Sequence, residues 1–160
     1  MDWNKIASPA IGKAGELRVR SELIFRGFNP GAFDFDDGTD IILSNRKRIG
    51  VKTCTNPSYQ KSSYSWCYKF SIRSPQVRKG DGSANYKKIY QDRNWNEHID
   101  YWILWCVKDN FFYIIPEGEV TAKFSLVVAT PLEKRRYKKH TWKDSISKYE
   151  KYKNNWEQLR

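Results

Sequence analysis

Two strongly apolar runs in the second half of the chain place the tightest limit on its fold. Residues 101–107 and residues 111–115 are rich in aromatic and β-branched side chains, and the polar residues 108–110 separate them. This pattern predicts two antiparallel strands joined by a tight turn. Because neither run alternates apolar with polar residues, other elements must cover both faces of the hairpin. The sequence therefore predicts a buried central sheet, in which Pro116 ends the second of these strands.

A second predicted hairpin carries the first candidate functional residues. Residues 38–43 and 49–54 are mainly apolar and β-branched, and residues 44–48 form a short polar, basic connection. Asp40 opens the first strand and Lys52 lies inside the second, so a carboxylate and an ammonium are expected near each other on one small sheet. This pair suits phosphodiester hydrolysis, because a carboxylate holds a divalent cation through oxygen and a lysine stabilises phosphate charge or helps to deprotonate water. A satisfied ion pair or two solvated edge residues would give the same pattern.

The first helix is predicted to start at Ser8-Pro9, with the hydroxyl as cap and proline in the first turn, and to stop at Gly27. Its expected core-facing stripe has helical spacing and consists of Ala10, Ala14, Leu17, Ser21 and Ile24. Glu16 lies at the edge of that stripe, where it can point towards the sheet. The alternative is a weak exposed ion pair with Arg20, four residues on.

The remaining elements follow from shorter patterns. Alternation of aromatic and polar residues predicts a half-buried strand over 64–71, whose core face consists of Tyr64, Trp66, Tyr68 and Phe70. Residues 84–98 and 117–123 are expected to form short helices, and residues 124–129 a further strand. Thr141 can cap a terminal helix, whose packed face consists of Trp142, Ile146, Tyr149 and Trp156.

Composition limits the class of protein. The chain fits a single domain over 1–160, with a core over about 8–131 and a basic C-terminal segment over 132–160. Its 29 Lys and Arg against 18 Asp and Glu give a net charge of +11, which indicates a polyanionic partner and nucleic acid first.

Three widely spaced cysteines and two histidines indicate neither a zinc site nor a disulfide framework, which favours a reducing, cytoplasmic location. No run approaches the roughly 20 apolar residues that span a bilayer, so a soluble protein without a membrane partner is expected.

Basic side chains gather where they could contact DNA phosphates. Residues 131–160 alone hold ten Lys or Arg against four Asp or Glu. The candidate DNA-binding residues, from the connection at 44–48, the loop over 73–82 and the basic run that precedes the terminal helix, are Arg46, Lys47, Arg48, Arg78, Lys79, Lys134, Arg135, Arg136, Lys138 and Lys139. Simple solubilisation of the surface is the alternative.

Several short motifs, spread in order over most of residues 10–158, carry a family resemblance. They are Gly12-x-x-Gly15-Glu16, Gly27-Phe28, Gly38-Thr39-Asp40-Ile41-Ile42, Ile49-x-Val51-Lys52-Thr53, Ile99-Asp100-Tyr101-Trp102, Phe112-Tyr113-Ile114-Ile115-Pro116 and Lys151-Tyr152-Lys153-Asn154-Asn155-Trp156. In order and spacing the chain resembles the PD-(D/E)XK nuclease superfamily, and most closely its group I intron-associated, homing-endonuclease-like branch.

The resemblance implies a fold and a reaction. The fold is α/β, with a central mixed β-sheet flanked by α-helices, as in restriction endonucleases, and a basic C-terminal helix. The reaction is Mg²⁺-dependent, site-specific hydrolysis of double-stranded DNA, with Mn²⁺ able to substitute. In that scheme Asp40 binds the metal, Glu16 joins it directly or through water, and the backbone carbonyl of Val51 adds a ligand. Lys52 then orients or deprotonates the attacking water. Cleavage of both strands by subunits with one site each implies a dimer or tetramer.

One motif position departs from the family pattern. Where the family places Glu, Asp or often Gln, this chain has Gly50, which offers neither a ligand nor a hydrogen bond to the water. Either the site works with fewer ligands, or another group substitutes, or the domain binds DNA without cutting it. Mg²⁺ needs only one or two carboxylates, so a working site is physically possible. A restriction or repair nuclease, or an RNA-binding protein that uses its aromatic side chains, are the other hypotheses.

Overall fold

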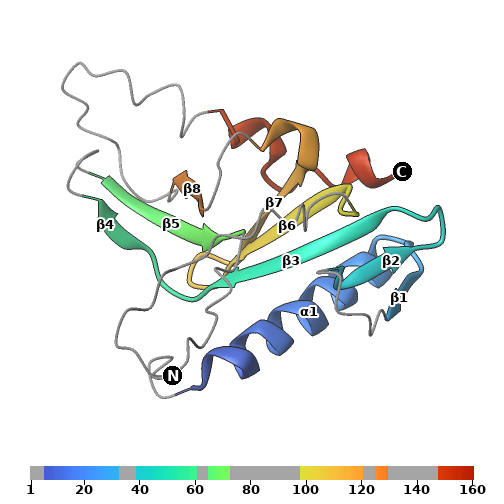
Figure 1. The fold of residues 1–160 in the computed structure, drawn as a ribbon, viewed down its shortest axis with the longest axis horizontal. Coiled ribbons are helices and arrows are strands. Elements are labelled where there is room, and N and C mark those ends of the chain that lie inside the picture. The colour runs from blue at the N-terminus through green and yellow to red at the C-terminus, as the bar shows by residue number, and fades with distance from the viewer. Residues whose placement is uncertain (1–5, 33–38, 61–64, 73–97, 121–124, 130–147) are drawn as a thin grey trace, which may run out of the picture.

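The structure is a computed structural model, and it describes residues 6–32, 39–60, 65–72, 98–120, 125–129 and 148–160. Helix α1 (Ser8–Phe25) lies along one face of a sheet whose longest strand is β3 (Arg48–Cys54) (Figure 1). This arrangement confirms the predicted α/β class. Among the described residues, no helix is long and apolar enough to cross a membrane.

A five-stranded mixed sheet forms the centre of the fold. Besides β3 it contains β1 (Pro30–Ala32), β2 (Ile41–Leu43), β6 (Tyr101–Cys106) and β7 (Phe111–Pro116), in the order β1-β2-β3-β6-β7. The β2–β3 and β6–β7 pairs are the two predicted hairpins, which are therefore confirmed. The strands β3 and β6 pair in parallel and join the hairpins to each other.

A second, three-stranded antiparallel sheet was not foreseen as a separate unit. It has the order β4-β5-β8 and consists of β4 (Ser58–Gln60), β5 (Ser65–Ser71) and β8 (Ser125–Ala129). The predicted strands are present over 65–71 and 125–129, and Tyr64 of the expected aromatic face lies outside the described residues. The remainder of that face is only partly correct. Tyr68 and Phe70 are buried, whereas Trp66 is 43% exposed and contacts Tyr59 of the edge strand β4.

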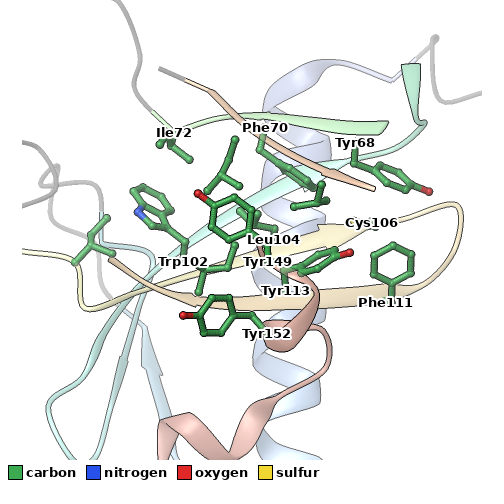
Figure 2. Close-up of a cluster of buried hydrophobic side chains, with 14 residues drawn as sticks. Tyr68, Phe70, Ile72, Trp102, Leu104, Cys106, Phe111, Tyr113, Tyr149 and Tyr152 are labelled. Carbon is green, nitrogen blue, oxygen red and sulfur yellow. The ribbon is translucent and has the colours of Figure 1, made fainter. Parts of the chain in front are cut away.

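Two clusters of apolar side chains form the core, one on each face of the five-stranded sheet. Figure 2 shows the first, which includes Trp102, Leu104 and Cys106 of β6 together with Tyr68 and Phe70 of β5. The second joins α1 to the other face of the sheet through Val19 and Leu23 of the helix and Ile49 and Val51 of β3. Because side chains alternate along a strand, Gly50 and Lys52 belong to the first face of β3.

Helix α1 has the predicted length but a different buried face. The helix starts at Ser8 and ends before Gly27, which has the positive φ of 81° expected of a helix-ending glycine. The N-cap position is Ala7, without a side-chain cap, so the predicted Ser8 cap is wrong. The buried residues are Gly15, Val19 and Leu23. All five residues of the predicted stripe are exposed, namely Ala10, Ala14, Leu17, Ser21 and Ile24. The rotation follows from Gly15, whose missing side chain lets the helix approach β3 closely.

The described part of the C-terminal segment is not one helix. It contains two short 3-10 helices, η3 (Glu150–Tyr152) and η4 (Trp156–Leu159), and another, η2 (Glu117–Glu119), follows β7. Between η3 and η4, Asn154 donates its N–H to the Phe112 carbonyl at 2.8 Å and accepts the Phe112 N–H at 2.9 Å. These bonds to the edge of β7 replace a continuous helix. Residues 84–97 and 130–147, where two further helical predictions fall, lie outside the described residues.

Candidate active site

Asp40 lies immediately before β2 and extends the pairing of β2 with β3 by one residue. Its N–H donates to the Ile49 carbonyl at 2.9 Å, and its Oδ2 accepts the Val51 N–H at 2.6 Å. The carboxylate therefore accepts a hydrogen bond from the Val51 N–H of β3, which lies beyond the end of the short strand β2. The Asp40 carboxylate is therefore held against the backbone of β3 at Val51.

Burial, a hydrogen bond and three nearby charges shift the pKa of Asp40. Burial raises the pKa of this carboxyl above its ordinary value, and the hydrogen bond from Val51 and the charge of Lys52 act against that rise. The negative charge of Glu16 raises the pKa further, and the ammonium of Lys13 lowers it. The charges of Glu16, Lys52 and Lys13 thus all act on Asp40, while the joint catalytic role of Glu16, Asp40 and Lys52 stays a prediction.

Glu16 reaches this place because α1 packs tightly on β3 at the preceding residue. A Cβ added to Gly15 would lie 1.7 Å from Oγ1 of Thr53, so only glycine permits the observed approach. The carboxylate of Glu16 accepts a hydrogen bond from the Lys13 ammonium at 2.9 Å. Arg20 does not pair with Glu16, as one sequence hypothesis had it, but donates to the backbone carbonyl of Asp40 at 3.1 Å.

Lys52 and Gly50 lie beside an aromatic side chain of the neighbouring strand. Nζ of Lys52 is 5.5 Å from the centre of the Trp102 ring, a cation–π distance. Trp102 pairs with Gly50 in the parallel register of β3 and β6. A Cβ on Gly50 would meet ring atoms of Trp102 at 2.4 and 2.7 Å and the Ile99 Cδ1 at 2.9 Å. The missing motif side chain has therefore left no gap, because its volume is filled by Trp102 and Ile99.

The donor set available to a divalent cation is small. Across the residues that the structure describes, no group of three or more His, Cys, Asp or Glu side chains is arranged to hold a metal ion. Asp40 and Glu16 supply two carboxylates, and Val51 is tied to Asp40 through its N–H. Mg²⁺ keeps several waters and takes one or two carboxylates, so this set fits such an ion. A cation would also offset the burial that raises the pKa of Asp40.

Two of the cysteines are poor candidates for a nucleophile. All three are free, and burial raises the pKa of the Cys54 and Cys106 thiols. A thiolate, the reactive form, is therefore disfavoured at both positions.

Three of the ten candidate DNA-binding residues can be located. Arg46 is exposed in the turn between β2 and β3, and its φ of 66° shows how tightly the turn closes. Lys47 donates to the backbone carbonyls of Gln158 at 3.0 Å and Arg160 at 2.8 Å, which ties the turn to the C-terminal segment. The N–H of Arg48 donates to Asp100 Oδ2 at 2.7 Å. The other seven lie outside the described residues, and they are Arg78, Lys79, Lys134, Arg135, Arg136, Lys138 and Lys139.

An open groove of about 450 Å³ runs beside this turn. It is lined by residues of the turn, of the start of β6 and of the end of β7, including Arg46, Lys47, Asp100 and Glu117. Its acidic and basic side chains are mixed, so the groove does not by itself favour an anionic ligand.

Sequence reasoning missed four residues of the site, namely Lys13, Arg20, Thr53 and Trp102. Lys13 and Arg20 carried a usable signal, since they stand three residues before and four residues after Glu16 on one helix. Arg20 was considered only as a partner of Glu16. The sequence held no signal for the roles of Thr53 and Trp102, because these roles depend on how α1 packs on β3 and on the register between β3 and β6.

The fold of this chain is similar to that of a solved structure. The structure of a bacterial homing endonuclease, I-Ssp6803I, matches 96% of this chain and 91% of its own chain, with a TM-score of 0.60 and 12% sequence identity. No protein-family model matches the chain. No match was found among curated proteins either. At 12% identity the likeness shows the fold, and it confirms the predicted nuclease-like architecture, while membership of the PD-(D/E)XK superfamily stays a prediction.

Proposed function

We propose that the protein is an Mg²⁺-dependent, homing-type endonuclease that hydrolyses phosphodiester bonds at specific sites in double-stranded DNA. The observation that supports this most directly is that the charges of Glu16 and Lys52 both act on the half-buried carboxylate of Asp40. The net charge of +11 and the likeness to a protein described as a homing endonuclease support the choice of DNA as substrate.

Each residue of the site has a role in this proposal. Asp40 and Glu16 would hold the cation, with the Val51 carbonyl as a further oxygen ligand. A bound Mg²⁺ would polarise the scissile phosphate and acidify a bound water. Lys52 would orient or deprotonate the attacking water and stabilise the negative charge that builds on the phosphate. Lys13 would release Glu16 from its ion pair when the cation binds.

A non-catalytic DNA-binding domain on the same fold is the second candidate. It is favoured by Gly50, which contributes no side-chain ligand and whose neighbouring volume is occupied by Trp102 and Ile99. The two candidates differ first in whether phosphodiester bonds break in the presence of a divalent cation.

The test is cleavage of supercoiled plasmid and of a random-sequence duplex library, with Mg²⁺ or Mn²⁺ and with EDTA as the metal-free control. Asp40→Ala and Glu16→Gln are expected to abolish or strongly reduce cleavage. Glu22→Gln is the matched control, because Glu22 is a similarly shielded carboxylate on α1 that pairs with Arg18 and Arg26. Equal cleavage by the wild type and Asp40→Ala would refute the assigned site.

A metal-binding measurement separates the two candidates when no cleavage is seen. Mg²⁺ or Mn²⁺ is expected to raise the melting temperature of the wild type, since a ligand that binds only the folded state stabilises it. The Asp40→Asn variant is expected to show no such rise. DNA binding without any metal response would favour the non-catalytic domain.

The subunit number follows from the same proposal. If both strands are cut, two sites must face the duplex, so a dimer or tetramer is expected. Light scattering after size-exclusion chromatography measures the mass of the assembly, with and without a duplex that the library experiment selects. A monomer that makes double-strand breaks would contradict this part of the proposal.

A further inference from the structure

Trp102 belongs to one of the family motifs, but the proposed function gives it no role. It is 2% exposed and lies at one end of the aromatic cluster between the two sheets (Figure 2). Its indole N–H donates to the carboxylate of Glu117, which immediately follows β7. The ring is therefore fixed at its polar edge by a charge-assisted hydrogen bond and on its apolar surface by packing.

The position of this ring excludes any side chain at residue 50. Contacts of 2.4 and 2.7 Å from an added Cβ to Trp102 ring atoms are far inside van der Waals distance. The ring cannot rotate away without losing its bond to Glu117, and β3 cannot move without breaking its ladder with β6. Glycine at 50 and tryptophan at 102 are thus a matched pair.

The same ring contacts the amine that the reaction needs. Lys52 follows Gly50 by two residues and emerges from the same face of β3. Its ammonium lies 5.5 Å from the ring centre, and its charge acts on Asp40. A partly desolvated ammonium gains attraction from an indole face, which limits the directions that the long, flexible side chain can take.

We propose that Trp102 is the positioning residue of this site, which fills the volume next to Gly50 and holds the Lys52 ammonium in place relative to Asp40. The inference rests on the proposed function for its catalytic consequence, but its structural content can be tested without cleavage. It also changes what a restored motif would do. Gly50→Gln in the wild-type background is expected to unfold the site rather than to increase cleavage.

The first experiment is a double-mutant cycle on thermal stability. Gly50→Ala is expected to lower the melting temperature of the wild type, because its Cβ meets the indole. In the Trp102→Leu background the same substitution is expected to have a much smaller effect, since the two ring atoms in its path are gone. An equal loss from Gly50→Ala in both backgrounds would overturn the proposed filling of this volume.

The second experiment locates the Lys52 amine directly. A methylene group near an indole face has upfield-shifted proton resonances, so the Lys52 ε-protons are expected upfield of their position in a free lysine in a ¹H–¹³C spectrum. The shift should persist in Trp102→Phe, which keeps an aromatic ring, and disappear in Trp102→Leu. Should Trp102→Leu not fold, Glu117→Gln, which weakens the anchor of the ring, is expected to reduce the shift. An unchanged Lys52 resonance in both variants would overturn the proposal.

The third experiment measures the catalytic consequence. At saturating protein, Trp102→Leu is expected to slow single-turnover cleavage between about twofold and thirtyfold, the range of a cation–π contact. DNA affinity measured in Ca²⁺ should be unchanged, and Trp102→Phe should retain most of the rate. Trp105→Leu is the matched control, because Trp105 lies on the same strand and stacks on Phe112 at the opposite face. A rate equal to that of the wild type in Trp102→Leu would refute the positioning role. If the wild type itself cleaves nothing, the proposed function fails, while the first two experiments still decide where Lys52 and Trp102 lie.

Discussion

The contact between Gly15 and Thr53 yields the sharpest quantitative prediction, because α1 provides its own control. Gly15 and Gly12 occupy the same helix, and neither has a positive φ. A Cβ at Gly15 would lie 1.7 Å from Thr53 Oγ1 and 3.0 Å from Thr53 Cβ, whereas a Cβ at Gly12 would meet nothing within 4 Å. Rotation of the Thr53 side chain could move Oγ1 aside, but the Cβ contact would remain. Helix and strand must then separate by some tenths of an ångström.

The two alanine substitutions are therefore expected to have opposite effects on stability. Gly12→Ala should raise the free energy of unfolding by up to about 1 kcal/mol, through higher helix propensity alone. Gly15→Ala has the same gain but also an overpacking cost of about 1–3 kcal/mol, so the variants should differ by roughly that cost. At about 2–4 °C per kcal/mol for a chain of this size, their melting temperatures should differ by roughly 2–12 °C.

Thermal unfolding followed by tryptophan fluorescence measures this difference. A Thr53→Ala background removes Oγ1 but not Cβ, so it should restore part of the loss in Gly15→Ala and none in Gly12→Ala. Since Glu16 follows Gly15, the displaced helix should also slow cleavage in Gly15→Ala and not in Gly12→Ala. Equal melting temperatures for the two glycine variants would refute the argument that the close approach of α1 requires glycine.

Three further outcomes are expected. Burial raises the pKa of Asp40 in the folded state, so ionisation of this carboxyl destabilises the fold as pH rises above 3.8. Asp40→Asn should therefore have a higher melting temperature than the wild type at pH 7, and this difference should close as the pH is lowered. Glu22 behaves in the opposite way. Burial acts to raise its pKa, but hydrogen bonds from Arg26 and Arg18 outweigh burial and hold the pKa below 4.5, so the ionised carboxylate stabilises the fold. Glu22→Gln should therefore be less stable than the wild type at pH 7, and the difference should vanish in acid. A difference in melting temperature between variant and wild type that does not change with pH would contradict the statement for that residue. Trp156→Ala should lower the free energy of unfolding in urea by about 3–5 kcal/mol, because the ring is buried against Phe112 at 5.1 Å, and a loss well below that range would mean that η4 is dispensable.

Local signals in the sequence were sufficient for the hairpins and for the ends of α1. The β2–β3 and β6–β7 pairs each join neighbouring apolar runs through a short turn, so their pairing needs no information from elsewhere in the chain. The position of Asp40 followed from the same pattern. The buried face of α1 could not be predicted in this way, because the apolar spacing of Leu17 and Ile24 favours a face that the structure leaves 57% and 61% exposed at those residues. The approach at Gly15, which depends on shape rather than on hydrophobicity, decides the rotation.

Features that join distant segments were out of reach of sequence reasoning. The parallel register of β3 and β6 places Trp102 beside Gly50, and no pattern within either strand specifies it. The terminal segment was expected to continue as a helix, whereas Asn154 exchanges hydrogen bonds with the edge of β7 and has a positive φ of 50°. A resemblance in motif order was enough to propose two acids and one lysine as site residues, but it could not indicate that Trp102 and Ile99 fill the space beside Gly50.

The parallel pairing of β3 with β6 also sets the order in which the molecule can assemble. Each hairpin closes a short loop, while the pairing of Ile49 with Tyr101 must close the long connection between them, which costs more chain entropy and is slow. Asp40 and Val51 belong to one hairpin and can meet early, whereas Trp102 arrives only when the two halves dock. In refolding followed by indole fluorescence, the signal that Trp102→Phe removes from the wild type should therefore fall in the slowest phase, after the acidic end of the site has formed.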